Sequence, residues 1–70
     1  MKLSARNQLT GTVVEVVKGA TTAHVRIDIG GGHLLTASIT NEAVDELNLG
    51  RGQRARAIIK ASDVMIGVED

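Results

Sequence analysis

The sequence predicts one small, mainly β domain whose core needs reinforcement from another molecule. With 70 residues the chain is one domain, and a domain of this size leaves a large share of its surface in water. Runs rich in valine, isoleucine and threonine alternate with glycine-containing turns, a pattern typical of short strands. The chain has no Phe, Trp, Tyr or Cys, so its core is aliphatic and no disulfide supports it. Oligomerisation is the remaining way to stabilise such a core.

The balance of charge bears on the class of ligand. Eight lysines and arginines match eight aspartates and glutamates, whereas domains that bind nucleic acid tend to be basic and to carry aromatic stacking surfaces. We therefore expect no nucleic-acid partner, although a small anion at one local site remains compatible. No apolar leader follows Met1 and no apolar run could span a bilayer. The expected protein is cytoplasmic and has no membrane partner.

The first predicted strand covers Gln8 to Val17. Its valines do not alternate, because they occupy positions 13, 14, 16 and 17. A strand that is apolar on both faces is usually buried on both faces. We interpret the second face as a contact with another subunit.

A hairpin is predicted next. The loop Lys18–Thr22 precedes a strand over Ala23–Ile29, in which apolar and polar residues alternate cleanly. Gly30–Gly32 predicts a tight turn, since glycines accept the positive φ angles of such turns. The chain then returns as a third strand over His33–Thr40.

A change of period predicts one short helix over Asn41–Leu47. Either Thr40 or Asn41 can cap its N-terminus, because both side chains accept a hydrogen bond from a first-turn N–H. Gly50 is the expected left-handed residue that ends it.

Two further strands complete the predicted fold. The fourth covers Gln53–Lys60, with Arg54 and Arg56 on an outward face that we interpret as solvated. Ala61–Asp63 interrupts the pattern, and Val64–Val68 is the fifth strand. Five short strands with one helix between the third and fourth indicate an all-β, five-stranded Greek-key barrel of the oligonucleotide/oligosaccharide-binding (OB) type.

Two short segments carry the residues expected of an oxyanion site. Ser4-Ala5-Arg6-Asn7 and Lys60-Ala61-Ser62 each combine a hydroxyl, a small side chain and a fixed cation. Such segments offer N–H and O–H donors with little bulk, and their two cations match the charge of a dianion. The alternative is a polar lead-in and a strand end, both solvated. We expect the segments to meet across a subunit boundary, with the side chain of Asp63 pointing away from the anion.

Other chemistry is less favoured by the residues. His24 and His33 are expected out of register across the hairpin, with no carboxylate cluster around them, so no metal site is predicted. Gly30–Gly32 lacks the Gly-Lys-Ser/Thr that would make it a phosphate loop. No nucleophile and base can be paired, so no enzyme activity is expected.

The paired segments also resemble a known family. Ser4-Ala5-Arg6-Asn7-Gln8-Leu9, Gly11-Thr12-Val13 and Ile58 to Met65 are similar to the molbindins, small molybdate-binding proteins made of a Mop-type (TOBE) domain. The resemblance spans residues 1–70 as one domain. It implies a five-stranded barrel, a hexamer built as a trimer of dimers, and a cytoplasmic role in molybdenum storage and homeostasis. It also implies that molybdate, and tungstate similarly, binds at subunit interfaces.

The resemblance further implies which residues bind the anion. Ser4, Arg6 and Asn7, with Ala5 leaving the backbone open, would come from one subunit, and Lys60, Ala61 and Ser62 from its neighbour. Thr40 matches a hydroxyl position used in related regulator domains, although capping the helix is a rival role. The family has a second class of site near symmetry axes. The candidate for it is the loop of Lys18, Gly19, Ala20, Thr21 and Thr22.

Two biological roles stay open. Related domains also occur fused to a molybdate-import ATPase or to a DNA-binding regulator. Because the motif begins near Met1, we expect a free-standing binder. The alternative is a molybdate-sensing module that acts through a protein partner.

Overall fold

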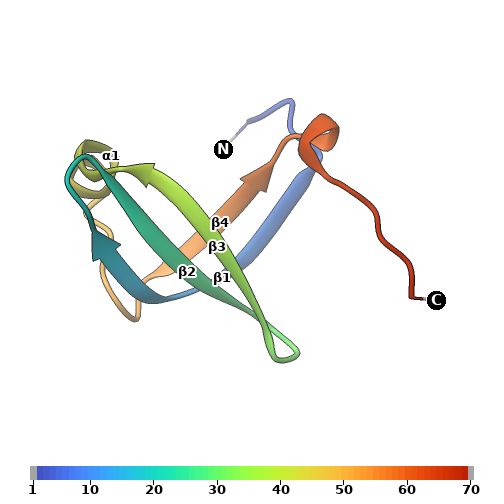
Figure 1. The fold of residues 1–70 in the computed structure, drawn as a ribbon, viewed down its shortest axis with the longest axis horizontal. Coiled ribbons are helices and arrows are strands. Elements are labelled where there is room, and N and C mark those ends of the chain that lie inside the picture. Colours follow the sequence, from blue (N-terminus) through green and yellow to red (C-terminus); the bar gives the residue numbers. More distant parts are fainter. Residues whose placement is uncertain (1, 70) are drawn as a thin grey trace.

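The computed structural model describes residues 2–69, which form a strongly twisted antiparallel sheet and one short helix (Figure 1). The elements are β1 (Asn7–Lys18), β2 (Thr22–Gly30), β3 (His33–Thr40), α1 (Asn41–Glu46), β4 (Arg54–Ile59) and the 3₁₀ turn η1 (Ala61–Asp63). The four strands pair in the order β3-β2-β1-β4. Figure 1 shows the β2–β3 hairpin crossing the β1–β4 pair at a steep angle, with α1 at one end of the molecule and η1 at the other.

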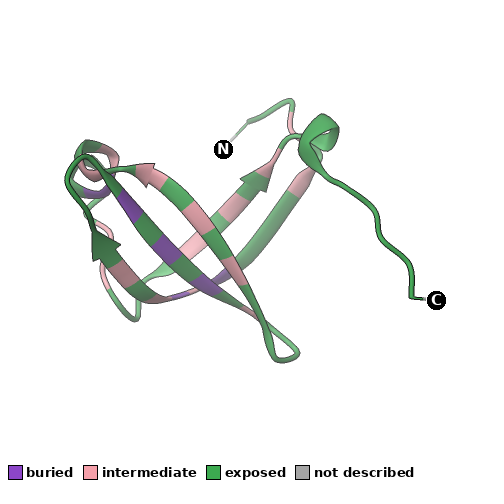
Figure 2. Ribbon diagram, viewed as in Figure 1, coloured by how far each residue is buried: buried purple, intermediate pink, exposed green. Residues whose placement is uncertain are grey.

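The core is small and lies on one face of the hairpin. Its buried residues are Val13, Ala23, Val25, Ile27 and Val44. Figure 2 shows them as a short line of purple bands, most of them on β2. The alternation predicted for β2 is confirmed, because Ala23, Val25 and Ile27 are buried, Ile29 is partly buried, and the residues between them are exposed. So few aliphatic side chains give a weak core, as the composition indicated.

A β-bulge explains the valines of β1. The pairing with β2 shifts register between Val13 and Glu15, which leaves Val14 as the extra residue. After the bulge, Val16 packs against the core, while Val17 is 53% exposed. The bulge resets the alternation of β1, and in the single chain the second face is open. The interpretation that another subunit covers this face stays a prediction.

Gly11 allows β1 and β2 to approach closely. A Cβ atom at this position would lie 2.4 Å from the backbone oxygen of Asp28 and 2.6 Å from Cγ2 of Ile27. Any side chain would force the strands apart at the point where the sheet curves. Gly30, Gly31 and Gly32 all have positive φ, which confirms the predicted turn.

The helix α1 is one residue shorter than predicted and begins as expected. The hydroxyl of Thr40 accepts a hydrogen bond from the N–H of Ala43 (3.0 Å), so Thr40 is the N-cap. The left-handed residue beyond the helix is Asn48, with φ 52°. The assignment of that role to Gly50 was wrong, because asparagine also tolerates this conformation.

The fifth predicted strand does not form within the described residues. Residues 64–69 follow η1 as an extended segment without strand pairing, and Met65, Ile66 and Val68 are 92%, 85% and 89% exposed. In Figure 1 this segment, which we call the C-terminal tail, runs away from the sheet. The single chain is thus a four-stranded open sheet, and closure into a five-stranded barrel is not confirmed.

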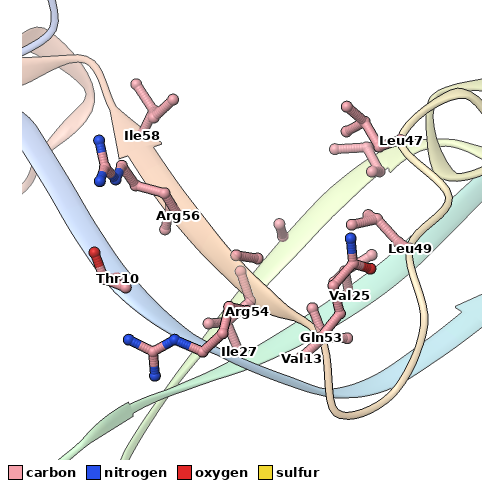
Figure 3. A pocket seen from close by; sticks show the side chains of 14 residues that line it. Thr10, Val13, Val25, Ile27, Leu47, Leu49, Gln53, Arg54, Arg56 and Ile58 are labelled. Carbon is pink, nitrogen blue, oxygen red and sulfur yellow. The ribbon is translucent and has the colours of Figure 1, made fainter. Parts of the chain in front are cut away.

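An open apolar groove lies between the two strand pairs. It has a volume of about 730 Å³ and is lined by core residues such as Val13 and Val25, by Leu47 and Leu49 after α1, and by β4. Figure 3 shows Leu47, Leu49 and Val25 across the groove from Thr10 and Arg56. The core of the single chain is therefore uncovered on this side.

Candidate functional site

Pairing of β1 with β4 brings the two anion-binding segments together. Asn7 lies opposite Ile59 in the ladder, and its side-chain N–H donates to the Ile59 carbonyl (3.2 Å). Ser4–Asn7 therefore lies beside Lys60–Ser62 at one end of the molecule, as Figure 1 shows. The two segments were expected to meet across a subunit boundary, but the structure already places them side by side within one chain.

The cations of the two segments are not neutralised internally. The side chains of Arg6 and Lys60 are exposed. Within residues 2–69, neither belongs to an ion pair, since those of the described chain join Lys18 to Asp45 and Arg26 to Glu15. Two positive charges at one end of a sheet, without a paired carboxylate, attract a dianion.

Hydrogen-bond donors surround these charges. The 3₁₀ turn η1 is closed by the N–H of Asp63, which donates to the Lys60 carbonyl (2.9 Å). The first N–H groups of such a turn, here those of Ala61 and Ser62, have no partner inside it. The hydroxyls of Ser4 and Ser62 are exposed. The arrangement offers charge, N–H and O–H groups within a short stretch of surface.

Two side-chain amides tie the first segment to β4, and sequence reasoning missed one of them. The side chain of Gln8 donates to the Ala5 carbonyl (3.1 Å) and accepts from Nη1 of Arg56 (3.2 Å). Asn7 was predicted to bind the anion, yet its N–H is directed at Ile59. The only sequence signal for Gln8 was its position inside the motif.

The remaining predicted site residues lie at the other end of the sheet. Thr40 pairs with Thr22, and the N–H of Asn41 donates to the Thr21 carbonyl (2.9 Å). Thr40 is thus next to the loop Lys18–Thr22, and Figure 1 shows this end, beside α1, opposite the end that carries η1. Within one chain Thr40 does not join the Ser4 and Lys60 segments.

Most of the loop's polar groups have internal partners. Lys18 forms an ion pair with Asp45, and the N–H of Gly19 donates to the Thr22 carbonyl (2.7 Å). The side chain of Asn41 donates to the Gly19 carbonyl (2.9 Å). Thr21 and Thr22 are exposed, so their hydroxyls can meet a ligand.

The histidines do not gather other ligating side chains. His24 lies opposite Ser38, and His33 opens β3 after the glycine turn. Among the described residues no three His, Cys, Asp or Glu side chains are close enough to hold a metal ion. The same part of the chain contains no helix with the length and apolarity needed to cross a bilayer.

Fold and site together define a small β domain with a cationic, hydroxyl-rich corner. A model of the TOBE domain matches residues 3–66, and the chain belongs to this family. It is 56% identical over 69 residues to a probable molybdenum-pterin-binding protein of Haemophilus influenzae, covering 99% of this chain and 100% of that protein. The family membership indicated by the sequence motifs is confirmed.

Solved structures agree with the fold. A molybdate-binding protein from Sporomusa ovata has a TM-score of 0.91 and 38% identity, with 97% of this chain and 100% of that chain covered. The cytoplasmic molybdate-binding protein ModG, with molybdate bound, has a TM-score of 0.93 and 49% identity, with 99% of this chain and 49% of that chain covered. These values support a mainly β fold of antiparallel strands with one short helix.

Proposed function

We propose that this protein binds molybdate, and tungstate similarly, at the corner formed by Ser4–Asn7 and Lys60–Ser62. The observation that supports the proposal is the β1–β4 register, in which Asn7 pairs with Ile59, so that the segments carrying Arg6 and Lys60 continue from adjacent strand ends. Neither cation belongs to an ion pair among the described residues. The names of the similar proteins, which refer to molybdenum-pterin or molybdate binding, support the choice of anion.

The proposed chemistry is binding and release without a covalent step. Arg6 and Lys60 balance the two negative charges of a tetrahedral oxyanion. Hydroxyls of Ser4 and Ser62 and the N–H groups of Ala5 and Ala61 complete its hydrogen bonds. Discrimination against the smaller sulfate would follow from the size of the hole, since both anions accept the same donors. The protein is therefore proposed as a cytoplasmic storage protein rather than an enzyme.

We further propose that the chain works as a homo-oligomer, assembled as a hexamer from three dimers. The support is the exposed C-terminal tail, whose apolar side chains have no cover, together with the open apolar groove. Exposed apolar surface of this kind marks an interface. If the tail of one copy adds to the sheet of another, it becomes the fifth strand of a closed barrel.

The loop Lys18–Thr22 remains our candidate for a second, weaker anion position, with Thr40 beside it. The exposed hydroxyls of Thr21 and Thr22 support this assignment. The ion pair with Asp45 argues against this assignment, because its carboxylate neutralises the charge of Lys18. Anion binding there would require the ion pair to open.

Calorimetric titration with molybdate, tungstate and sulfate tests the proposal. We expect tight binding of the first two anions and much weaker binding of sulfate. Native mass spectrometry of the same samples gives the number of subunits and of anions per assembly. Equal affinity for sulfate, or an absence of molybdate binding, would contradict the proposed function.

A further inference from the structure

Gln8 lies within the motif that begins at Ser4, yet the chemistry described so far gives it no role. Its amide makes two hydrogen bonds, donating from Nε2 to the Ala5 carbonyl (3.1 Å) and accepting at Oε1 from Nη1 of Arg56 (3.2 Å). The partners fix the orientation of this amide, because a carbonyl can only accept and a guanidinium can only donate. Gln8 therefore bridges the backbone carbonyl of Ala5 and the guanidinium of Arg56.

The bridge joins the two strands that carry the anion-binding segments. Gln8 lies opposite Ile58 in the β1–β4 ladder, next to the pair formed by Asn7 and Ile59. Arg56 stands on the same face as Ile58, two residues earlier on the strand that leads into Lys60. The Ala5 carbonyl is thus tied to the strand from which the other half of the site continues.

The segment before β1 has few other restraints. Among the described residues, the hydrogen bond from Gln8 to Ala5 is the side-chain hydrogen bond that reaches Ser4–Arg6, and the amide of Asn7 holds the chain one residue later. Fixing the backbone of a free segment at the moment of binding has an entropic cost per residue. A segment held beforehand avoids this cost and binds more tightly.

The charge of Arg56 is too far from Lys60 to contribute much to anion binding by itself. Arg56 precedes Lys60 by four strand positions, which is about 13 Å along β4. Exposed charges at that separation are largely screened at physiological ionic strength, where the Debye length is about 8 Å. A hydrogen-bonded effect, in contrast, persists in salt.

We propose that Gln8 and Arg56 are positioning residues for the oxyanion site. Arg56 holds Gln8, and Gln8 holds the Ala5 carbonyl. In this way the N–H groups of Ala5 and Arg6 and the guanidinium of Arg6 stay turned toward Lys60. This inference rests on the proposed function of the corner as a molybdate site. It assigns an indirect role in molybdate affinity to two exposed side chains, which act through the Ala5 carbonyl rather than on the anion.

The test uses the full-length protein and calorimetry with molybdate at 0.15 M and 0.5 M KCl. We expect Gln8→Ala and Arg56→Ala each to weaken binding about fivefold to tenfold at both salt concentrations, the loss expected for one or two net hydrogen bonds. Arg54→Ala is the matched control, because it removes the same charge from the same face of β4 without touching Gln8. We expect this control to change the affinity less than twofold.

A double-mutant cycle sharpens the result. If Gln8 and Arg56 act as one unit, the Gln8→Ala/Arg56→Ala protein should lose little more affinity than either single variant. Arg56→Lys, which keeps a donor, should restore part of the affinity. Thermal melting and circular dichroism of each variant report whether the fold is intact.

Several outcomes would overturn the inference. One is a lower melting temperature without weaker molybdate binding, since that result assigns the pair a purely structural role. Another is an equal loss in Arg54→Ala that vanishes at 0.5 M KCl, because it shows an effect of charge alone. If the unmutated protein binds no molybdate, the proposed function fails first, and that failure is distinct from a protein that binds equally well in all variants.

Discussion

The two ends of the sheet carry similar residue types in different states. At the η1 end, Arg6 and Lys60 have no carboxylate partner in the described part of the chain, and the exposed tail follows directly. At the α1 end, Lys18 is paired with Asp45 and the hydroxyl of Thr40 caps the helix. The lysine of the η1 end is thus available for a ligand, whereas the lysine and the Thr40 hydroxyl of the α1 end are engaged in internal contacts. Composition alone does not distinguish a binding site from a structural junction.

The largest expected effect comes from removing the cations of the η1 end. Arg6→Ala and Lys60→Ala should each weaken molybdate binding about a hundredfold, because a charged hydrogen bond contributes about 1.5–3 kcal/mol and a dianion then keeps half of its compensation. Isothermal calorimetry measures the change. Arg51→Ala, which removes an exposed cation from the loop before β4, is the control. Unchanged affinity in both variants would place the site elsewhere.

The second prediction concerns the C-terminal tail. Met65→Asp and Ile66→Asp should shift the assembly toward smaller species in native mass spectrometry, because burying a carboxylate in an apolar interface is strongly unfavourable. Glu69→Gln, a change at an exposed polar position of the same tail, should leave the assembly intact. An unaltered mass distribution in the aspartate variants would show that the tail is not an interface.

The same variants locate the anion site relative to the subunits. If a dissociated chain still binds molybdate, the Ser4 and Lys60 segments of one chain suffice, as their shared β1–β4 register allows. If affinity is lost together with assembly, the neighbouring subunit supplies part of the site, as the family resemblance implies. The two results show whether all ligands of the anion come from one chain or whether some come from a neighbouring subunit.

Thr40→Ala tests the hydroxyl that caps α1. Loss of the N-cap should lower the free energy of unfolding by about 1 kcal/mol, because the Ala43 N–H then lacks its partner. Chemical denaturation measures this change, and Thr40→Ser, which keeps the hydroxyl, should restore the stability. Molybdate affinity should change less than twofold. A large loss of affinity with unchanged stability would instead make Thr40 a ligand of the anion.

Local patterns in the sequence were sufficient for most elements, but not for the placement of the two segments, which were expected to meet across a subunit boundary and lie beside each other within one chain. Strand β2 follows its alternation, and the helix begins where Thr40 caps it. The bulge in β1 was not predicted from its irregular valines, because a bulge depends on the partner strand and leaves no mark in a single run of residues. The tail also differs from its prediction, because Val64–Val68 has strand composition yet pairs with neither edge strand of its own sheet, β3 or β4.

The smallest effect is expected from Asp45→Asn. The Lys18–Asp45 pair is exposed on both sides, so its loss should change stability by about 0.2–1 kcal/mol. The freed lysine beside the exposed hydroxyls of Thr21 and Thr22 would then resemble the η1 end. We expect native mass spectrometry to show additional, weakly held molybdate that a further Lys18→Ala change removes. If the anion count stays the same, the loop lacks the donor geometry that Ser4–Asn7 and Lys60–Ser62 share, and the difference between the ends is one of backbone arrangement rather than of charge.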